Sequence, residues 1–124
     1  MDWLEPVKIL VVDDYELICR SVARSLRDHA VTMATRALSA LELIQHGERF
    51  DAIICDAFMA EMDGLQLHEA LVSFAPDQAA RMIFMSGKAE AIEANTYLRS
   101  LPNALIAKPF DIVELRRLIA EVSR

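Results

Sequence analysis

The chain has 124 residues, of which 54% are hydrophobic and 26% are charged, so its length and composition suit one globular domain with a single core. Its 13 basic and 19 acidic residues give a formal net charge of −6, which argues against nucleic-acid binding by the domain and suits a basic partner or a cation. No apolar run approaches the roughly 20 residues needed to cross a bilayer, and the first residues lack a signal-peptide pattern, so we expect a cytoplasmic protein without membrane contact.

Five short apolar runs predict β-strands. The first is rich in β-branched residues and stops at the acidic pair Asp13-Asp14. The third is a continuous apolar run that ends at Asp56, which is typical of a strand buried on both faces. The predicted strands span residues 7–12, 29–34, 51–55, 81–85 and 103–107.

Amphipathic helices are predicted after each of these strands, because apolar residues recur there every three or four positions. Gly47 ends the second predicted helix and Pro76 closes the third. The fourth has only a thin apolar stripe and should be the least firmly packed. The predicted helices span residues 16–28, 38–46, 67–74 and 88–100, and a last one starts at Asp111.

Strict alternation of strands and helices requires a parallel sheet with right-handed crossovers. We therefore predict an α/β fold with a doubly wound, five-stranded parallel sheet and helices on both of its faces. The order 2-1-3-4-5 puts the apolar first, third and fourth strands in the middle and the weaker second and fifth strands at the edges. We expect one domain over residues 1–124, with residues 1–6 as an N-terminal lead.

Polar side chains stand where four of the predicted strands end. Asp13 and Asp14 follow the first strand, Asp56 the third, Ser86 the fourth and Lys108 the fifth. In a doubly wound sheet these ends meet near the switch point between the first and third strands, where ligands bind. Each residue alone suits an ordinary turn. Together they supply the groups that phosphoryl transfer needs.

Three clustered carboxylates repel one another unless a hard divalent cation neutralises them, and Mg²⁺ prefers carboxylate, water and phosphate oxygens. We expect Asp14 and Asp56 to bind Mg²⁺ directly and Asp13 to bind it directly or through water. An Asp56 oxygen could then attack a phosphorus atom to form an aspartyl phosphate. Lys108 and Ser86 would stabilise the charge that develops on the phosphoryl oxygens.

The chain resembles, over nearly its whole length, the receiver domain of two-component response regulators. The motifs that carry the resemblance are Ile9-Leu10-Val11-Val12-Asp13-Asp14, Asp56 followed by Met59 and Met62-Asp63-Gly64, Met85-Ser86-Gly87, and Lys108-Pro109-Phe110. The resemblance implies a flavodoxin-like domain phosphorylated on Asp56 by a histidine kinase or a histidine phosphotransfer protein. Such a domain promotes only its own phosphorylation and dephosphorylation and is not otherwise an enzyme.

The resemblance also implies a cis peptide bond before Pro109, and a Mg²⁺ site that is completed by the backbone carbonyl of Phe58. Phe58 and Lys88 lie two residues after Asp56 and Ser86, at positions that vary in the family and affect how long the phosphoryl group lasts. We therefore predict slow loss of the phosphoryl group, because the apolar Phe58 would hinder attacking water and Lys88 would add positive charge near the phosphate. A lifetime of only a few seconds would contradict this expectation.

Two positions depart from the family's pattern. Receivers usually have proline four residues after the phosphorylated aspartate, where this chain has Ala60, so a looser loop is expected. Many receivers also have an aromatic switch residue three positions before the lysine, where this chain has Leu105. We therefore expect a different readout, through the loop after Asp56 or the fourth helix. Amide shifts that stay within the crevice on phosphorylation would count against it.

Two other functions stay open. A binding module could keep the fold without phosphorylation, although the intact acidic set and Lys108 argue against this. A Mg²⁺-dependent aspartyl-phosphate phosphatase would need a second aspartate two residues after the nucleophile, where Phe58 stands. For a receiver, the output must come from contact with another domain or protein. Dimerisation through the last helices and the fifth strand is possible.

Overall fold

Five parallel strands form one sheet in the computed structural model, which describes residues 5–87 and 95–124. The spatial order is β2-β1-β3-β4-β5, as predicted from the alternation of strands and helices. Each strand lies within one or two residues of its predicted position. The strands are β1 (Lys8–Val12), β2 (Ala30–Ala34), β3 (Ala52–Asp56), β4 (Met82–Ser86) and β5 (Leu105–Ala107).

The apolar strands occupy the centre of the sheet because helices cover both of its faces. All residues of β3 and β4 are buried, and in β1 only Lys8 is exposed. The edge strands are more exposed, and β5 buries only its middle residue, Ile106. This burial pattern explains why continuous apolar runs, rather than alternating ones, mark the central strands.

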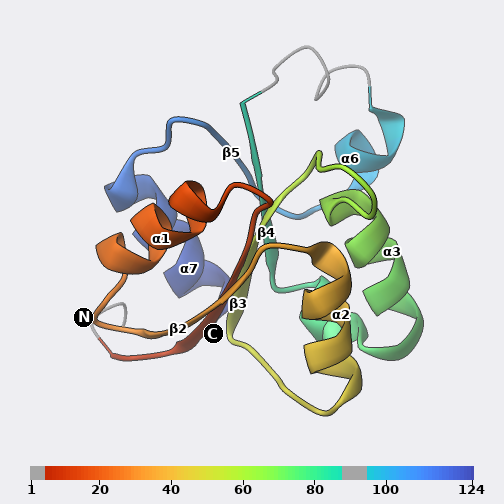
Figure 1. Cartoon of the computed structure of the whole chain (residues 1–124), viewed down its shortest axis with the longest axis horizontal. Coiled ribbons are helices and arrows are strands. Elements are labelled where there is room, and N and C mark those ends of the chain that lie inside the picture. The colour runs from red at the N-terminus through yellow and green to blue at the C-terminus, as the bar shows by residue number, and fades with distance from the viewer. Residues whose placement is uncertain (1–4, 88–94) are drawn as a thin grey trace.

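The helices form two layers, one on each face of the sheet (Figure 1). On one face α1 and α7 cover a core that includes Ile9, Ile54 and Met85. On the other face α2, α3 and α6 cover a core that includes Leu10 and Phe84. The helices are α1 (Glu16–Ser25), α2 (Ala37–Gln45), α3 (Gly64–Phe74), α4 (Pro76–Ala79), α6 (Thr96–Ser100) and α7 (Ile112–Val122).

Several helices differ from the sequence prediction: α1 ends at Ser25 rather than at residue 28, and α3 begins at Gly64 rather than at residue 67. Pro76 does not only close α3: it also begins the short helix α4, because proline is well suited to a first helical position. The Gln78 side chain of α4 is buried and bonds to both the backbone N–H and the carbonyl of Phe50, which fastens the start of β3. Of the helix predicted at 88–100, only α6 lies within the described residues.

No helix within residues 5–87 and 95–124 is long and apolar enough to cross a membrane.

Candidate functional site

The carboxyl ends of β1, β3, β4 and β5 bring the predicted polar residues together at one edge of the sheet. Asp13 directly follows β1, Asp56 and Ser86 are the last residues of β3 and β4, and Lys108 directly follows β5. Because the strands are parallel and in register, these ends meet. They open into a crevice of about 540 Å³, lined in part by Asp14, Asp56, Ser86 and Lys108.

Lys108 links two of the carboxylates of the site, because its ammonium forms ion pairs with both Asp13 and Asp56. Its Nζ donates to Asp13 Oδ2 at 2.6 Å and to Asp56 Oδ2 at 3.0 Å. Its backbone N–H donates to the Ser86 carbonyl, which fixes the start of the lysine side chain beside β4. The Lys108–Pro109 peptide bond is cis, as the resemblance implies.

Burial and pairing act against each other on the charges of this site. Burial opposes the charge of Lys108, but hydrogen bonds and attraction from Asp13 and Asp56 outweigh it and raise the pKa of the ammonium. For Asp13 burial is the stronger effect, so the pKa of this carboxyl is raised although Lys108 and the Tyr15 N–H stabilise its charge. The Asp13 carboxylate, which is 0% exposed, therefore depends on cationic partners.

Three carboxylates lie close enough to share a cation. Asp13, Asp14 and Asp56 each offer an oxygen, and these oxygens lie within 4.8 Å of one another. Oxygen ligands with a high density of negative charge suit a hard divalent cation such as Mg²⁺. Phe58, whose carbonyl is the further predicted ligand, has its backbone N–H fixed by Asp56 Oδ1 at 3.1 Å. The donor set thus fits the cation that the sequence predicts.

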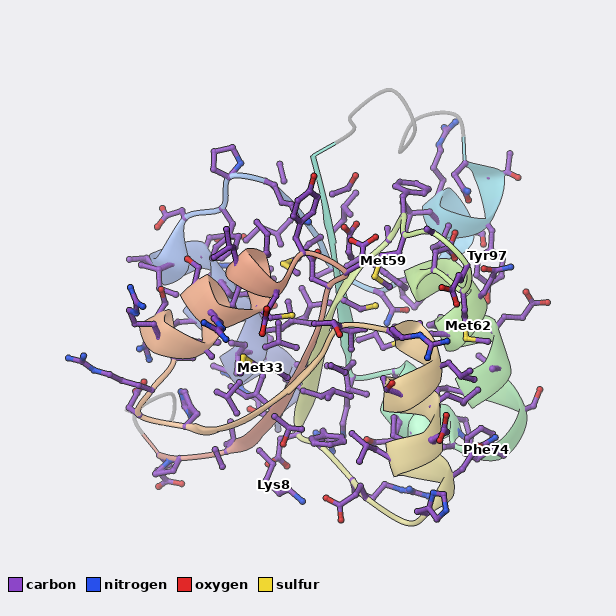
Figure 2. The ribbon with its side chains drawn as sticks, viewed as in Figure 1. Lys8, Met33, Met59, Met62, Phe74 and Tyr97 are labelled. Atoms are coloured by element: carbon purple, nitrogen blue, oxygen red, sulfur yellow. The ribbon has the colours of Figure 1, made fainter. Side chains whose placement is uncertain are left out.

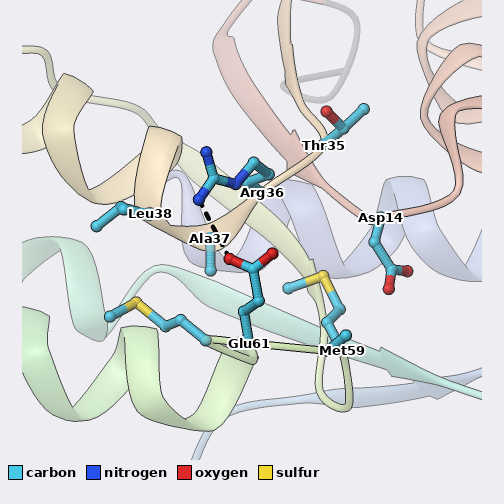
Figure 3. Close-up of a pocket in the computed structure, with 9 residues that line it drawn as sticks. Asp14, Thr35, Arg36, Ala37, Leu38, Met59 and Glu61 are labelled. Carbon is cyan, nitrogen blue, oxygen red and sulfur yellow. Dashed lines mark hydrogen bonds and ion pairs between the residues drawn. The ribbon is translucent and has the colours of Figure 1, made fainter.

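The loop after Asp56 is held at several points although Ala60 replaces the proline that is usual in receivers. The Ala57 N–H donates to the Met85 carbonyl of β4, and at the far end Asp63 and Gln66 form a reciprocal capping box at the start of α3. In between, Glu61 pairs with Arg36, the residue before α2, at 3.2 Å (Figure 3). These contacts hold the loop next to the phosphoacceptor candidate.

Replacing Glu61 with glycine should stabilise the protein. Glu61 has φ of 62°, in the left-handed region that costs about 1–2 kcal/mol for a residue with a Cβ. Its ion pair with Arg36 is solvent-exposed and is worth about 0.5 kcal/mol. We expect Glu61→Gly to raise the free energy of unfolding in urea by about 1 kcal/mol. Glu61→Gln, which loses the ion pair but keeps the strain, should lower it slightly. A glycine variant no more stable than the glutamine variant would contradict this explanation.

Tyr15 and Arg36 lie near the site, but sequence reasoning did not single them out. Tyr15 directly follows the acidic pair and lines the crevice, so its position beside Asp14 was an available signal. Arg36 lines a smaller neighbouring pocket with Asp14 and Glu61 (Figure 3), and only the fold brings it there from the end of β2. Lys88, a predicted modulator, lies outside the described residues.

Three ring side chains connect α3, β4 and α6, because His68 contacts both Phe84 and Tyr97. His68 of α3 is buried, and its Nδ1 is hydrogen-bonded to the Tyr97 hydroxyl at 2.9 Å. Its ring also contacts Phe84 of β4, with the ring centroids 5.9 Å apart. Tyr97 lies on α6, on the α3 side of the sheet (Figure 2). Leu105, at the usual switch position, is 36% exposed and belongs to the edge strand β5.

Comparison with known proteins agrees with the fold and identifies the family. The response regulator receiver domain family matches residues 9–120. The chain is 32% identical over 119 residues to Transcriptional regulatory protein ZraR of Klebsiella oxytoca, covering 94% of this chain. It is 32% identical over 112 residues to Response regulator MprA of Mycobacterium sp. (strain KMS), covering 89% of this chain. Among solved structures, the receiver domain of Francisella response regulator 1452 shares a TM-score of 0.79 and 25% identity, with 94% of this chain and 96% of that chain covered.

Two observations define the class of this protein. The chain forms a doubly wound sheet with Lys108 between two carboxylates at one edge, and the family model matches residues 9–120. The chain belongs to the response regulator receiver domain family of two-component signalling. It spans 26% of the length of the ZraR relative and 47% of the MprA relative.

Proposed function

We propose that Asp56 accepts a phosphoryl group from a phosphorylated histidine of a histidine kinase or a histidine phosphotransfer protein, with the help of Mg²⁺. The observation that carries the proposal is the Lys108 ammonium held between Asp13 and Asp56, where Lys108 and Asp56 also line a crevice. A lysine in this position offsets the negative charge of Asp13 and Asp56 and leaves the crevice accessible to a phosphoryl donor. Simple structural pairing would need neither three carboxylates nor access to solvent.

Each residue then has a defined role in the transfer. An Asp56 oxygen forms a bond to phosphorus while the bond from phosphorus to the donor histidine nitrogen breaks, and the carboxylate becomes an acyl phosphate. Asp14 and Asp56, with Asp13 directly or through water and with the Phe58 carbonyl, would hold Mg²⁺, which supplies charge neutralisation for the phosphoryl oxygens when bound. Lys108 and the Ser86 hydroxyl would donate to the same oxygens.

The proposed output is contact with another protein or domain, made while the protein resides in the cytoplasm. Leu105 lacks the aromatic ring and polar tip of the usual switch residue. A conformational change at Ser86 would therefore be transmitted through β4 instead. The contact from Phe84 to His68, and the hydrogen bond from His68 to Tyr97, give such a connection to α6. Dimerisation through the last two helices and β5 stays a prediction.

Intact-protein mass spectrometry after incubation with acetyl phosphate and Mg²⁺ tests the proposal. We expect a gain of one phosphoryl group in the parent protein and none in Asp56→Asn. Chelation of Mg²⁺ should suppress the gain. No reaction in the parent would favour the phosphorylation-independent binding module. Repeated turnover of phosphoester substrates would favour the phosphatase, against which the apolar Phe58 at the general-acid position argues.

A further inference from the structure

We infer that the ring of Tyr15 shields the phosphorylated form of Asp56 from water and so determines how long the phosphoryl group persists. This inference rests on the proposed phosphorylation of Asp56. It concerns a residue of the crevice that neither binds the cation nor donates to the phosphoryl group. Of the described residues that line the crevice, Tyr15 and Phe58 are aromatic.

The backbone of Tyr15 is fixed relative to Asp56 by a short series of hydrogen bonds. Its N–H donates to Asp13 Oδ1 at 2.9 Å, and Asp13 Oδ2 accepts from Lys108 Nζ, which also donates to Asp56. Its carbonyl accepts from Ile18 at 3.0 Å, at the start of α1. The point at which the side chain leaves the backbone is therefore held in position beside the acidic cluster.

The side chain itself is not used for packing. Tyr15 is 70% exposed, although it lines the crevice, so its ring is not needed to fill either core. Phe58, by contrast, packs partly against the core that α2 and α3 cover, which limits how far its ring can extend over the opening. The two aromatic rings are thus not equivalent, and Tyr15 is the one available to lie over the crevice.

Hydrolysis is the reaction that such a ring would slow. A water oxygen must form a bond to phosphorus as the bond from phosphorus to the Asp56 oxygen breaks, which releases inorganic phosphate and restores the carboxylate. The strand-end residues Asp56, Ser86 and Lys108 line the crevice, so we expect water to reach the phosphorus from its solvent side. A ring at this opening excludes water without adding a charge.

The rate of phosphoryl loss from phosphorylated variants tests this inference. The proteins are loaded with acetyl phosphate and Mg²⁺, the donor is removed, and the phosphorylated fraction is followed by intact-protein mass spectrometry. We expect Tyr15→Ala to lose its phosphoryl group about fivefold faster than the parent. Tyr15→Phe, which keeps the ring, should stay within about twofold of the parent rate.

Leu17→Ala is the matched control, because Leu17 is 77% exposed on α1 but does not line the crevice, and its rate should equal that of the parent. Circular dichroism confirms that each variant is folded. An unchanged or slower loss in Tyr15→Ala would overturn the inference, as would equally fast loss in Tyr15→Phe. If the parent is not phosphorylated at all, the proposed function fails instead, and the two failures are distinguishable.

Discussion

Replacing Lys108 with alanine should slow phosphorylation of Asp56 by about a hundredfold at saturating Mg²⁺. The loss of one preorganised donor to a developing oxyanion typically costs a factor of about 10²–10³. Lys108 already occupies its place beside Asp56, so its contribution in the parent needs no rearrangement of the chain. The measurement is the initial rate of phosphoryl gain from acetyl phosphate, followed by mass spectrometry.

The same substitution should destabilise the protein when no divalent cation is present. It leaves Asp13 without its ammonium partner, and removal of one member of a buried pair costs about 3 kcal/mol. Because the Lys108 side chain is 18% exposed, we expect a smaller effect: the free energy of unfolding in urea should fall by about 2 kcal/mol. Mg²⁺ should recover part of this loss, since it supplies positive charge to the same carboxylates.

Lys8→Ala is the control for both measurements. Lys8 forms an exposed ion pair with Glu48 at 3.5 Å and lies at the other end of β1 from the crevice (Figure 2). Its loss should change the unfolding free energy by less than about 1 kcal/mol and leave the phosphorylation rate as it is. Equal rates in Lys108→Ala and the parent would show that the ammonium does not take part in transfer.

Replacing Gly64 with alanine should lower the free energy of unfolding by about 3 kcal/mol or more. Gly64 is the first residue of α3, and a Cβ there would overlap the backbone carbonyl oxygen of Asp56. It would also approach Cys55 Sγ at 3.0 Å and the Ala57 Cα at 3.1 Å. Backbone atoms at the end of a buried strand cannot move aside cheaply, so this overpacking is at the costly end of its usual range.

Gly87→Ala is the matched control for Gly64→Ala, because among residues 5–87 and 95–124 an added Cβ at Gly87 would meet only Lys108 Cβ, at 3.7 Å. That is an ordinary contact, and we expect a change within about 0.5 kcal/mol. The measurement for both variants is the midpoint and slope of urea unfolding. Similar stabilities for the two alanine variants would show that the close approach of α3 to β3 tolerates a methyl group.

The arrangement of the sheet could be predicted from the sequence because local patterns carry it. Continuous apolar runs end in polar residues, helical spacing follows each run, and the crossover rule leaves few possible orders. Asp13, Asp56, Ser86 and Lys108 each stand where such a run ends, so their convergence follows from the parallel arrangement alone. The family's motifs added the expected cis bond before Pro109, which the structure has.

Other features of the site depend on distances that no local pattern encodes. Arg36 and Glu61 are 25 positions apart, and His68 and Tyr97 are 29 apart, so their pairing exists only once α2, α3 and α6 lie on the same face of the sheet. The role of Pro76 as the start of α4 was missed because the same residue type also ends helices.

The sequence by itself determined the order of the strands and the residues at their ends, because the side-chain pattern of a buried parallel sheet is local and periodic. Only the tertiary structure decided how these residues meet: that Lys108 lies between two carboxylates, that Gly64 approaches the end of β3, and that Tyr15 lines the crevice. These are contacts between separate segments, and their geometry is set by how helices pack on the sheet rather than by any one stretch of the chain.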